Sequence, residues 1–363
     1  VGVAYQIIAD VIKLEDIGKQ EKDFFINLSL SLGLIDNVVE LLEENLANSS
    51  NIEDKIFIIR QLISIYPNRA DYTEKTKTAV LKYGTLVDQN NCDQEGDYLQ
   101  LCMLLCPFEN DNQFTDYTER RNEYTKKFPN SKVFKIGSIN TDEGAEGLLE
   151  SLRDMAGITP ELIELWESNK QKLRSSELTI PFFMRGLYLQ DTRDIFTTWF
   201  LSKSSTDQEL EFKIIHSPQL NKNDFKDLID TSDVLLIEET SILVLNELGI
   251  FNSFLESLPR FSILERFFKE LNLTAHALLS PYNNIAGEIL KAIQNNLTKL
   301  DLIHLDEESL LQYDQSLKDK KGLLITDDLY VNKLVSIENQ GVQTGNIFNI
   351  LEYLGDKHVL DKS

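Results

Sequence analysis

Apolar residues recur at three- and four-residue spacing along residues 1 to 132, and short polar breaks interrupt them. This spacing places the apolar side chains on one face of each helix. The breaks include Gly33, Asn51 and the two aromatic-proline-asparagine sequences at 66–68 and 128–130. The pattern therefore predicts a series of paired helices across the first third of the chain.

The pattern changes twice further along. Glycines are concentrated at the start of residues 133 to 180, and two amphipathic stretches after them predict connector helices. From residue 181 to 363, short apolar runs alternate with amphipathic segments, which predicts a parallel α/β sheet. The predicted strands are residues 212–215, 234–237, 302–303 and 323–325. The predicted helices are residues 225–229, 242–248, 251–258, 261–271 and 285–297.

Two of the predicted strands end abruptly in acidic residues. Glu238 and Glu239 follow one apolar run, and Asp327 and Asp328 follow another. A continuous apolar run is typical of a strand covered on both faces, and ligands of parallel sheets bind at the carboxyl ends of the strands. We therefore expect these carboxylates to form an oxygen-rich site for Mg²⁺ or Mn²⁺. Phosphodiester hydrolysis is a reaction that such metal sites support.

The last half of the chain contains four stretches that combine strand-like and helix-like sequence. They read LLIEETSILVLNELG (235–249), RFSILERFFKEL (260–271) and LLITDDLYVNKL (323–334), with a further strand and helix at 341–354. Together they resemble a PIN-like nuclease domain of the kind found behind tetratricopeptide repeats in large bacterial proteins. The resemblance implies a three-layer α/β domain with a parallel sheet over residues 181 to 363. It also implies a metal-dependent endoribonuclease.

The resemblance assigns roles to individual carboxylates. Glu238 stands at the position of the first metal-binding aspartate, and Asp327 and Asp328 stand at that of the closing acidic pair. Glu265 or Glu270 stands at the position of a helical glutamate. The implied catalytic residues are Glu238, Glu265, Asp327 and Asp328, and the implied metal ligands are Glu238, Asp327 and Asp328.

The chain departs from the family pattern at two positions. Glu238 replaces the usual aspartate, which lengthens the side chain by one methylene, and Glu288 is the best candidate for the acidic residue that opens the helix before the final strand. Thr240 and Ser241 are expected to hydrogen-bond the first carboxylate or a metal-bound water. The two departures favour an alternative function, a catalytically inactive PIN-like adaptor for protein–protein interaction.

Each carboxylate also has a purely structural interpretation. Asp327 and Asp328 together form a good helix N-cap that needs no metal. The two glutamates after the first strand suit a solvated turn between strand and helix. Glu265 has Arg266 and Lys269 as helical neighbours, which is typical of an exposed charge. These interpretations remain open at this point.

The first third of the chain resembles tetratricopeptide-type repeats. Its two aromatic-proline-asparagine endings, at 66 and 128, are separated by 62 residues, close to the length of two such repeats. Stacked helix pairs of this kind usually bind other proteins. The resemblance implies a TPR-like α-solenoid over residues 1–132 that docks a protein partner or regulator, as in bacterial stress or defence systems. A plain helical domain without a partner is the alternative.

The net charge of −23 changes the expectation about nucleic acid. Tight nonspecific binding depends on Lys and Arg side chains that displace counterions from phosphate. We therefore expect no strong nonspecific nucleic-acid binding, and an RNA substrate would need metal ions, another subunit or a local basic group. Lys318, Lys320 and Lys321 form one such group before the last acidic strand, and a solvated loop is their structural interpretation.

Cysteine usage and hydropathy complete the expectations. Cys92, Cys102 and Cys106 are too few for a disulfide framework, and the last two are interpreted as buried small hydrophobic residues in a helix. No apolar run is long enough to cross a membrane and no signal peptide is recognisable, so a cytoplasmic protein is expected. The helical pattern is already present at Val1, so we expect a longer polypeptide or a processed product.

Overall fold

The computed structural model describes residues 19–66, 73–106, 111–131, 133, 144–175, 180–189, 194–204, 212–276, 282–304, 317, 321–338 and 342–357. These residues fall into two compact units, which are described separately below. The helical unit contains the described residues between Ile35 and Glu164, together with His276. The α/β unit contains the others. The boundaries at residues 132 and 180 remain predictions.

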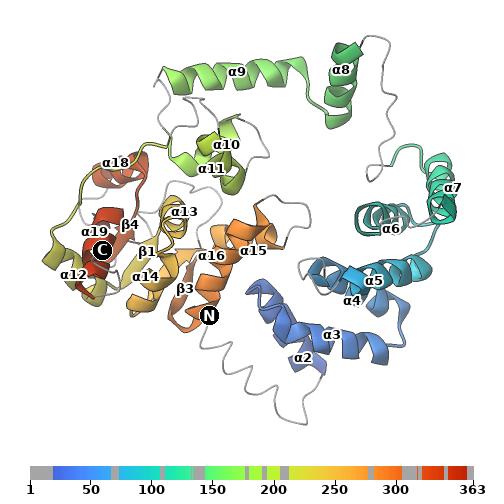
Figure 1. Cartoon of the computed structure of the whole chain (residues 1–363), viewed down its shortest axis with the longest axis horizontal. Helices are drawn as coiled ribbons and strands as arrows, with labels where there is room; N and C mark the ends of the chain where they lie inside the picture. The colour runs from blue at the N-terminus through green and yellow to red at the C-terminus, as the bar shows by residue number, and fades with distance from the viewer. Residues whose placement is uncertain are drawn as a thin grey trace. The chain divides into compact units, whose positions relative to one another are not determined.

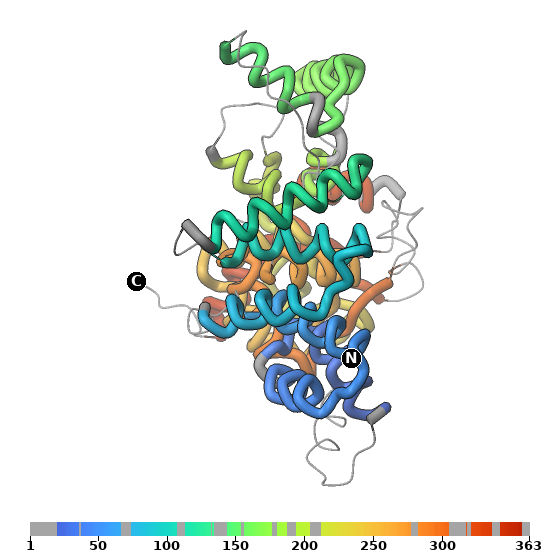
Figure 2. Tube along the Cα trace, turned by 90° about the vertical axis from the view of Figure 1, so that its right-hand side faces the viewer, coloured from blue at the N-terminus to red at the C-terminus, as the bar shows by residue number. Residues whose placement is uncertain are grey.

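The helical unit is a succession of helices in which each one from α3 to α7 packs against the next (Figures 1 and 2). They are α3 (Asp36–Asn48), α4 (Ile52–Ile65), α5 (Thr73–Leu86), α6 (Cys92–Leu105), α7 (Asp111–Lys127) and, further along, α8 (Gly144–Ala156). The predicted series of helices is therefore confirmed for the described residues between 19 and 131; the helical pattern expected from Val1 to residue 18 lies outside the described residues. Membership of the tetratricopeptide repeat family stays a prediction.

Asparagine caps and apolar stripes explain where these helices begin and why they pack. The Asn91 side chain accepts hydrogen bonds from the backbone N–H groups of Asp93 and Gln94, in the first turn of α6. Asn51 caps α4 in the same way. Such a cap stabilises a helix by about 1 kcal/mol because it satisfies an N–H group that the helix itself leaves unpaired. The buried stripe of α4 consists of Ile59, Leu62, Ile63 and Ile65.

The α/β unit is built on a five-stranded parallel sheet with the strand order β3-β2-β1-β4-β5 (Figure 1). The strands are β1 (Val234–Ile237), β2 (Phe261–Leu264), β3 (Leu300–Ile303), β4 (Gly322–Ile325) and β5 (Gln343–Gly345). The helices are α2 (Lys19–Ser31), α10 (Phe182–Leu189), α11 (Ile195–Ser204), α12 (Lys222–Thr231), α13 (Glu239–Glu247), α14 (Phe251–Ser257), α15 (Glu265–Ala275), α16 (Asn283–Asn295), the 3-10 helix η4 (Leu297–Lys299), α18 (Leu329–Glu338) and α19 (Ile347–Asp356). Helix α9 (Pro160–Arg174) runs across the division between the two units.

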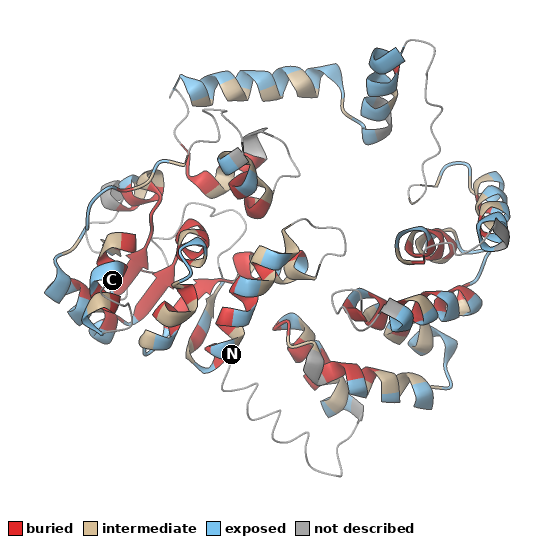
Figure 3. Cartoon of the chain, viewed as in Figure 1, coloured by how far each residue is buried: buried red, intermediate tan, exposed pale blue. Residues whose placement is uncertain are grey.

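The three inner strands are covered on both faces. Every residue of β1, β2 and β4 is buried, as the red strands in Figure 3 show. This burial explains their unbroken apolar sequences, since side chains of a strand alternate between the two faces of the sheet. The edge strand β3 follows a different pattern, because only its first residue, Leu300, is buried.

The sheet confirms three predicted strands and corrects two other predictions. The runs 234–237, 302–303 and 323–325 belong to β1, β3 and β4. The predicted helix at 261–271 is wrong in its first four residues, which form β2 and pair in parallel with β1. The predicted strand at 212–215 is reduced to one antiparallel bridge between Ile214 and Asp328. It lacks the partner strand that a ladder needs.

The C-terminal end of α2 docks on helices α15 and α16 of the same unit. The Asn272 side chain donates to the backbone oxygen of Leu30 at 2.9 Å, and the Gln294 side chain donates to that of Leu32 at 3.1 Å. Gly33 follows with a φ of 67°, a conformation that favours glycine. These bonds satisfy carbonyl groups that a helix end leaves unpaired. Helix α2 is therefore part of the α/β unit.

Candidate functional site

The carboxyl ends of β1 and β4 lie side by side where the strand order reverses. From β1 the chain continues to β2 and β3 on one side, and from β4 it continues to β5 on the other. Ile237 pairs with Ile325, and the Glu238 N–H donates to the Ile325 oxygen at 3.0 Å. Ligands of open parallel sheets bind at such a reversal point. The structure therefore brings Glu238, Asp327 and Asp328 to the edge where a ligand is expected.

Glu238 is fully buried, and one of its carboxyl oxygens has no hydrogen-bond partner among the described residues. Its Oε2 atom accepts from the Thr240 hydroxyl and, at 3.5 Å, lies near the Thr326 hydroxyl, whereas Oε1 is the unpartnered atom. Burial raises the pKa of Glu238 well above its ordinary value, and the charges of Glu239 and Asp328 raise it further. Burial therefore disfavours the charged form of Glu238.

Asp327 is buried and both of its carboxyl oxygens accept hydrogen bonds. Oδ1 accepts from the N–H of Ile347, the first residue of α19, at 2.9 Å. Oδ2 accepts from the Ser241 hydroxyl at 2.8 Å, and the Asp327 N–H donates back to the same hydroxyl at 2.8 Å. Burial raises the pKa of Asp327 although these bonds oppose the shift. Asp327 thus ties β4 to α13 and to the start of α19.

Asp328 caps two helices at once. Its Oδ1 atom accepts from the N–H groups of Tyr330 at 2.7 Å and Val331 at 3.4 Å, in the first turn of α18. Its Oδ2 atom accepts from the N–H of Phe182, which begins α10. Burial raises the pKa of Asp328, while the amide hydrogen bonds and the charge of Arg185 lower it. For Asp328, the N-cap interpretation of the sequence is confirmed.

Two arginines bring positive charge to this edge of the sheet. The Arg266 guanidinium donates to Glu239 Oε1 at 2.9 Å and lies 4.6 Å from the centre of the Phe183 ring. Arg185 is buried, and its guanidinium lies 5.8 Å from the centre of the Tyr330 ring. Glu239 is also buried, so the solvated turn expected after the first strand is wrong. The arginines offset part of the negative charge that the carboxylates concentrate here.

Glu265 lies at the carboxyl end of β2 and makes surface interactions. Its carboxyl oxygens contact Lys269 at 2.7 Å and His304 at 2.8 Å. These hydrogen bonds, first to Lys269 and then to His304, lower the pKa of Glu265. Its side chain is 30% exposed. Its partners are thus a lysine and a histidine, not the buried carboxylates after β1 and β4.

Glu270, the other helical glutamate, faces inward. Its Oε1 atom accepts from the N–H of Ile195, the first residue of α11, at 3.0 Å. Burial raises its pKa to about 7; the Ile195 hydrogen bond opposes the shift, and the charges of Asp194 and Glu239 add to it. Of the two helical candidates, Glu270 is therefore the one that interacts electrostatically with the residues after β1.

The remaining sequence candidates lie elsewhere. Glu288 is exposed on α16, where its carboxylate accepts from the Asn246 side chain at 3.4 Å. Lys321 directly precedes β4, so it lies at the opposite end of that strand from Asp327. The other two lysines of the basic group, at 318 and 320, lie outside the described residues. Neither Glu288 nor Lys321 joins the carboxylates at the strand ends.

A divalent cation fits this site in one respect and not in another. Glu238 Oε1 is a buried oxygen without a hydrogen-bond partner in the described part of the chain, and hard cations bind such carboxylate oxygens. Within the described part of the chain, however, no group of three or more His, Cys, Asp or Glu side chains is placed to hold a metal ion. The predicted ligands Glu238, Asp327 and Asp328 share one sheet edge without forming a complete metal cage.

Arg185 and Arg266 were not predicted from the sequence to take part in the site. Arg185 lies within the apolar sequence FFMRGLYL, and an arginine in such a helix is a signal of a buried cation with a partner. Arg266 offered no comparable signal, because its partner Glu239 is 27 residues away and is placed by the fold. The sequence therefore contained a signal for the buried Arg185 and none for Arg266.

Comparison with known proteins adds no relative, since no family model, no curated protein and no solved structure matches the chain. Among the helices that the structure describes, none is both long and apolar enough to cross a membrane. The interpretation of the site therefore depends on its geometry and on the family resemblance of its sequence.

Proposed function

We propose that the α/β unit is a PIN-like endoribonuclease domain that uses Mg²⁺ or Mn²⁺, and that the helical unit docks a protein partner or regulator. The main support is Glu238, which follows β1 at the reversal point of the sheet; its Oε1 is buried and has no hydrogen-bond partner among the residues that the structure describes. Leaving such an atom without a partner costs about 1–3 kcal/mol or more. A cation at Oε1 would remove this cost.

The surrounding residues would have definite roles toward such a cation. Glu238, Asp327 and Asp328 would hold it, and the bound ion would supply a water of lowered pKa and neutralise charge on the phosphate. The Thr240 hydroxyl fixes Oε2 of Glu238, and the Ser241 hydroxyl fixes Oδ2 of Asp327. Partners of this kind orient metal-binding carboxylates. Buried carboxylates with raised pKa values are also typical of functional sites.

The helical unit carries the proposed partner-binding function. Several of its large apolar side chains are exposed, and Phe57, on α4, is 62% exposed. The others on the helices that pack successively are Ile52, Leu81, Met103, Leu104 and Phe114. Apolar side chains at the surface favour a protein partner, as the net charge of −23 does, since it disfavours nonspecific nucleic-acid binding. The family resemblance supports a setting in bacterial stress or defence.

Cleavage of labelled single-stranded RNA and DNA tests the nuclease. The wild-type protein, Glu238→Gln and Asp328→Asn are each assayed with Mg²⁺, with Mn²⁺ and with a chelator. Glu352→Gln is the matched control, because Glu352 is an exposed glutamate on α19. We expect metal-dependent RNA cleavage by the wild type and the control, and none by Glu238→Gln. Cleavage that survives in Glu238→Gln would contradict the proposed site.

A catalytically inactive PIN-like adaptor is the second candidate, and a specific observation favours it. The carboxylates around Glu238 are already engaged within the protein. Asp327 and Asp328 accept hydrogen bonds from backbone N–H groups, and Glu239 is paired with Arg266. In this function the acidic residues hold helices α10, α18 and α19 against the sheet, and both units recognise proteins.

Metal-dependent thermal stability separates the two candidates. Mn²⁺ should raise the melting temperature of the wild-type nuclease, because ligand binding to the folded state stabilises it by mass action. The same addition should leave Glu238→Gln unchanged, since the variant lacks the carboxylate that Oε1 belongs to. An adaptor would show equal melting temperatures with and without Mn²⁺ in both proteins. Asp328→Asn is less informative here, because it also weakens two helix caps.

A further inference from the structure

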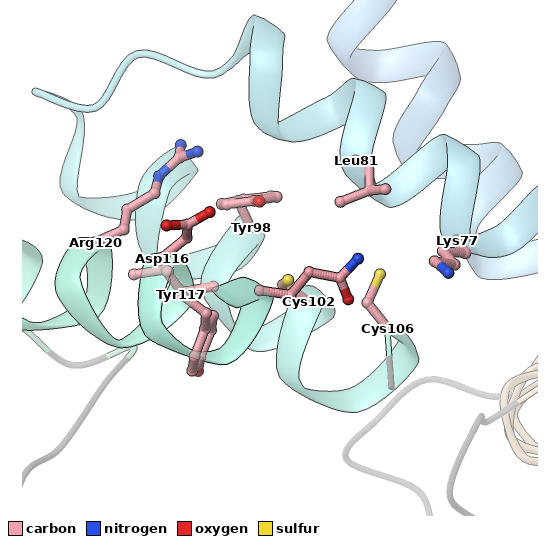
Figure 4. A pocket seen from close by; sticks show the side chains of 10 residues that line it. Lys77, Leu81, Tyr98, Cys102, Cys106, Asp116, Tyr117 and Arg120 are labelled. Carbon is pink, nitrogen blue, oxygen red and sulfur yellow. The ribbon is translucent and has the colours of Figure 1, made fainter. Parts of the chain in front are cut away.

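A pocket lies within the helical unit, lined by residues of α5, α6 and α7 and by Cys106, which caps the end of α6 (Figure 4). Its volume is about 250 Å³, which admits a small molecule. Leu81, Tyr98 and Leu99 supply apolar and aromatic walls, and charged side chains complete the lining. Cys102 and Cys106 are both buried residues, and both line the pocket. The pocket therefore gives access to their thiols.

The two thiols are placed by one helical turn. Cys102 lies in the last turn of α6 and Cys106 is its C-cap, with the Cys106 N–H donating to the Cys102 oxygen at 3.0 Å. Residues four apart in a helix have Cα atoms separated by about 6 Å. Disulfides join Cα atoms that lie about 4.4–6.8 Å apart. The spacing of Cys102 and Cys106 falls within this range, so a disulfide needs no large backbone movement.

The surroundings distinguish the two sulfur atoms. A hydrogen bond from Cys106 lowers the pKa of Cys102 to about 7 against the effect of burial, with smaller contributions from the Tyr98 hydroxyl and the charge of Arg120. The same hydrogen bond and burial raise the pKa of Cys106. Cys102 is therefore the more acidic of the two thiols.

Arg120 is held in place by a partner on the other helix. Its Nε and Nη2 atoms each donate to one carboxyl oxygen of Glu95, both at 2.6 Å. Its guanidinium also lies 4.2 Å from the centre of the Tyr98 ring. A two-point ion pair of this kind fixes the orientation of the guanidinium. The positive charge near Cys102 is thus a built feature of the α6–α7 contact.

We propose that this pocket is a peroxide-reactive dithiol site in which Cys102 is oxidised first and Cys106 then closes an intrahelical disulfide. The Cys102 thiolate attacks one oxygen of hydrogen peroxide; the O–O bond breaks, an S–O bond forms, and the leaving hydroxide takes up a proton. Cys106 loses its proton and attacks the Cys102 sulfur, which forms the S–S bond, breaks the S–O bond and releases water. In total, two thiols are oxidised and one peroxide is reduced to two waters.

The full chain offers its own control in Cys92, the third cysteine, whose sulfur lies 3.3 Å from the Tyr124 hydroxyl outside the pocket. Wild type, Cys92→Ser, Cys102→Ser and Cys106→Ser are treated with hydrogen peroxide. Free thiols are then counted, and peptide mass spectrometry locates any disulfide. Dimedone traps sulfenic acid, and dithiothreitol tests reversal. Glutathione in a separate, parallel tube reports that the oxidant is active.

We expect the wild type to fall from three free thiols to one, and Cys92→Ser to fall from two to none. In Cys106→Ser, dimedone should modify the sulfenic acid at residue 102. Cys102→Ser should form no disulfide. The initial oxidation rate of the wild type should rise about tenfold between pH 6 and pH 8, since the thiolate fraction of a group with a pKa of about 7 rises by that factor. Three free thiols after complete glutathione oxidation, or a disulfide that includes Cys92, would overturn the proposal.

Discussion

Replacing Glu270 with glutamine should remove a defined part of the pH dependence of stability of the α/β unit. Burial raises the pKa of Glu270 from 4.5 to about 7, while Oε1 accepts the Ile195 N–H at 3.0 Å. Glutamine has the same shape and keeps an oxygen for that hydrogen bond, but it does not ionise. The variant therefore removes the ionisation of residue 270 but keeps the hydrogen bond that caps α11.

The direction follows from proton binding in the two states. Between pH 4.5 and about pH 7, the unfolded chain has released the Glu270 proton while the folded protein retains it. Stability consequently falls as pH rises through this window, by about 1.4 kcal/mol per pH unit at most. Between pH 5 and pH 8, the wild type should lose about 2.5 kcal/mol relative to Glu270→Gln. Above pH 8 the difference should remain constant.

Urea unfolding at several pH values measures this difference. The chain has two tryptophans, so a Trp166→Phe background leaves Trp199, on α11, as the fluorescence reporter of the α/β unit. Glu352→Gln, an exposed glutamate on α19, is the control and should follow the wild type at every pH. Parallel pH profiles of the wild type and Glu270→Gln would refute a raised pKa at Glu270.

Four further changes test other parts of the structure. Gly345→Ala should lower the urea midpoint by the equivalent of about 1–3 kcal/mol, because its Cβ would lie 2.4 Å from the buried Phe225 ring. Asn91→Ala should destabilise the helical unit by about 1 kcal/mol in circular dichroism melts, because α6 loses its cap. Asn272→Ala should increase hydrogen exchange in α2, because it removes a bond to the α2 end; unchanged exchange would contradict the docking. Metal-free Glu238→Gln should melt above the wild type at pH 8, since the raised pKa of Glu238 makes its ionisation costly; a lower melting temperature would contradict that burial.

The fold was predictable where one kind of hydrophobic pattern dominated. The runs 234–237 and 323–325 are apolar at every position, which a strand covered on both faces requires. The segment 261–271 carries apolar residues at both helical and strand spacing. The prediction therefore joined the residues of β2 to those of α15 in one helix. The decision between strand and helix there depends on pairing with β1, which local sequence does not encode.

The site was predictable in its residues and not in its contacts. Acidic residues after apolar strands identified Glu238, Asp327 and Asp328, because parallel strands align their carboxyl ends. The bond from the Phe182 N–H to Asp328 joins residues 146 positions apart, and its existence depends on how α10 covers the sheet edge. The difference between Glu265 and Glu270 likewise depends on which face of α15 meets α11. Such contacts arise from tertiary packing.

The hydrogen bonds of Asp327 and Asp328 do not by themselves decide between nuclease and adaptor. A carboxylate oxygen has two lone pairs, so an oxygen that accepts an amide proton can also contact a cation. Glu238 differs, because its Oε1 is buried without a partner among the described residues. In an adaptor this atom is a persistent destabilising feature, and in a nuclease it is the oxygen that would bind the cation. The response of Glu238 to metal, rather than the number of acidic residues nearby, therefore distinguishes the two functions.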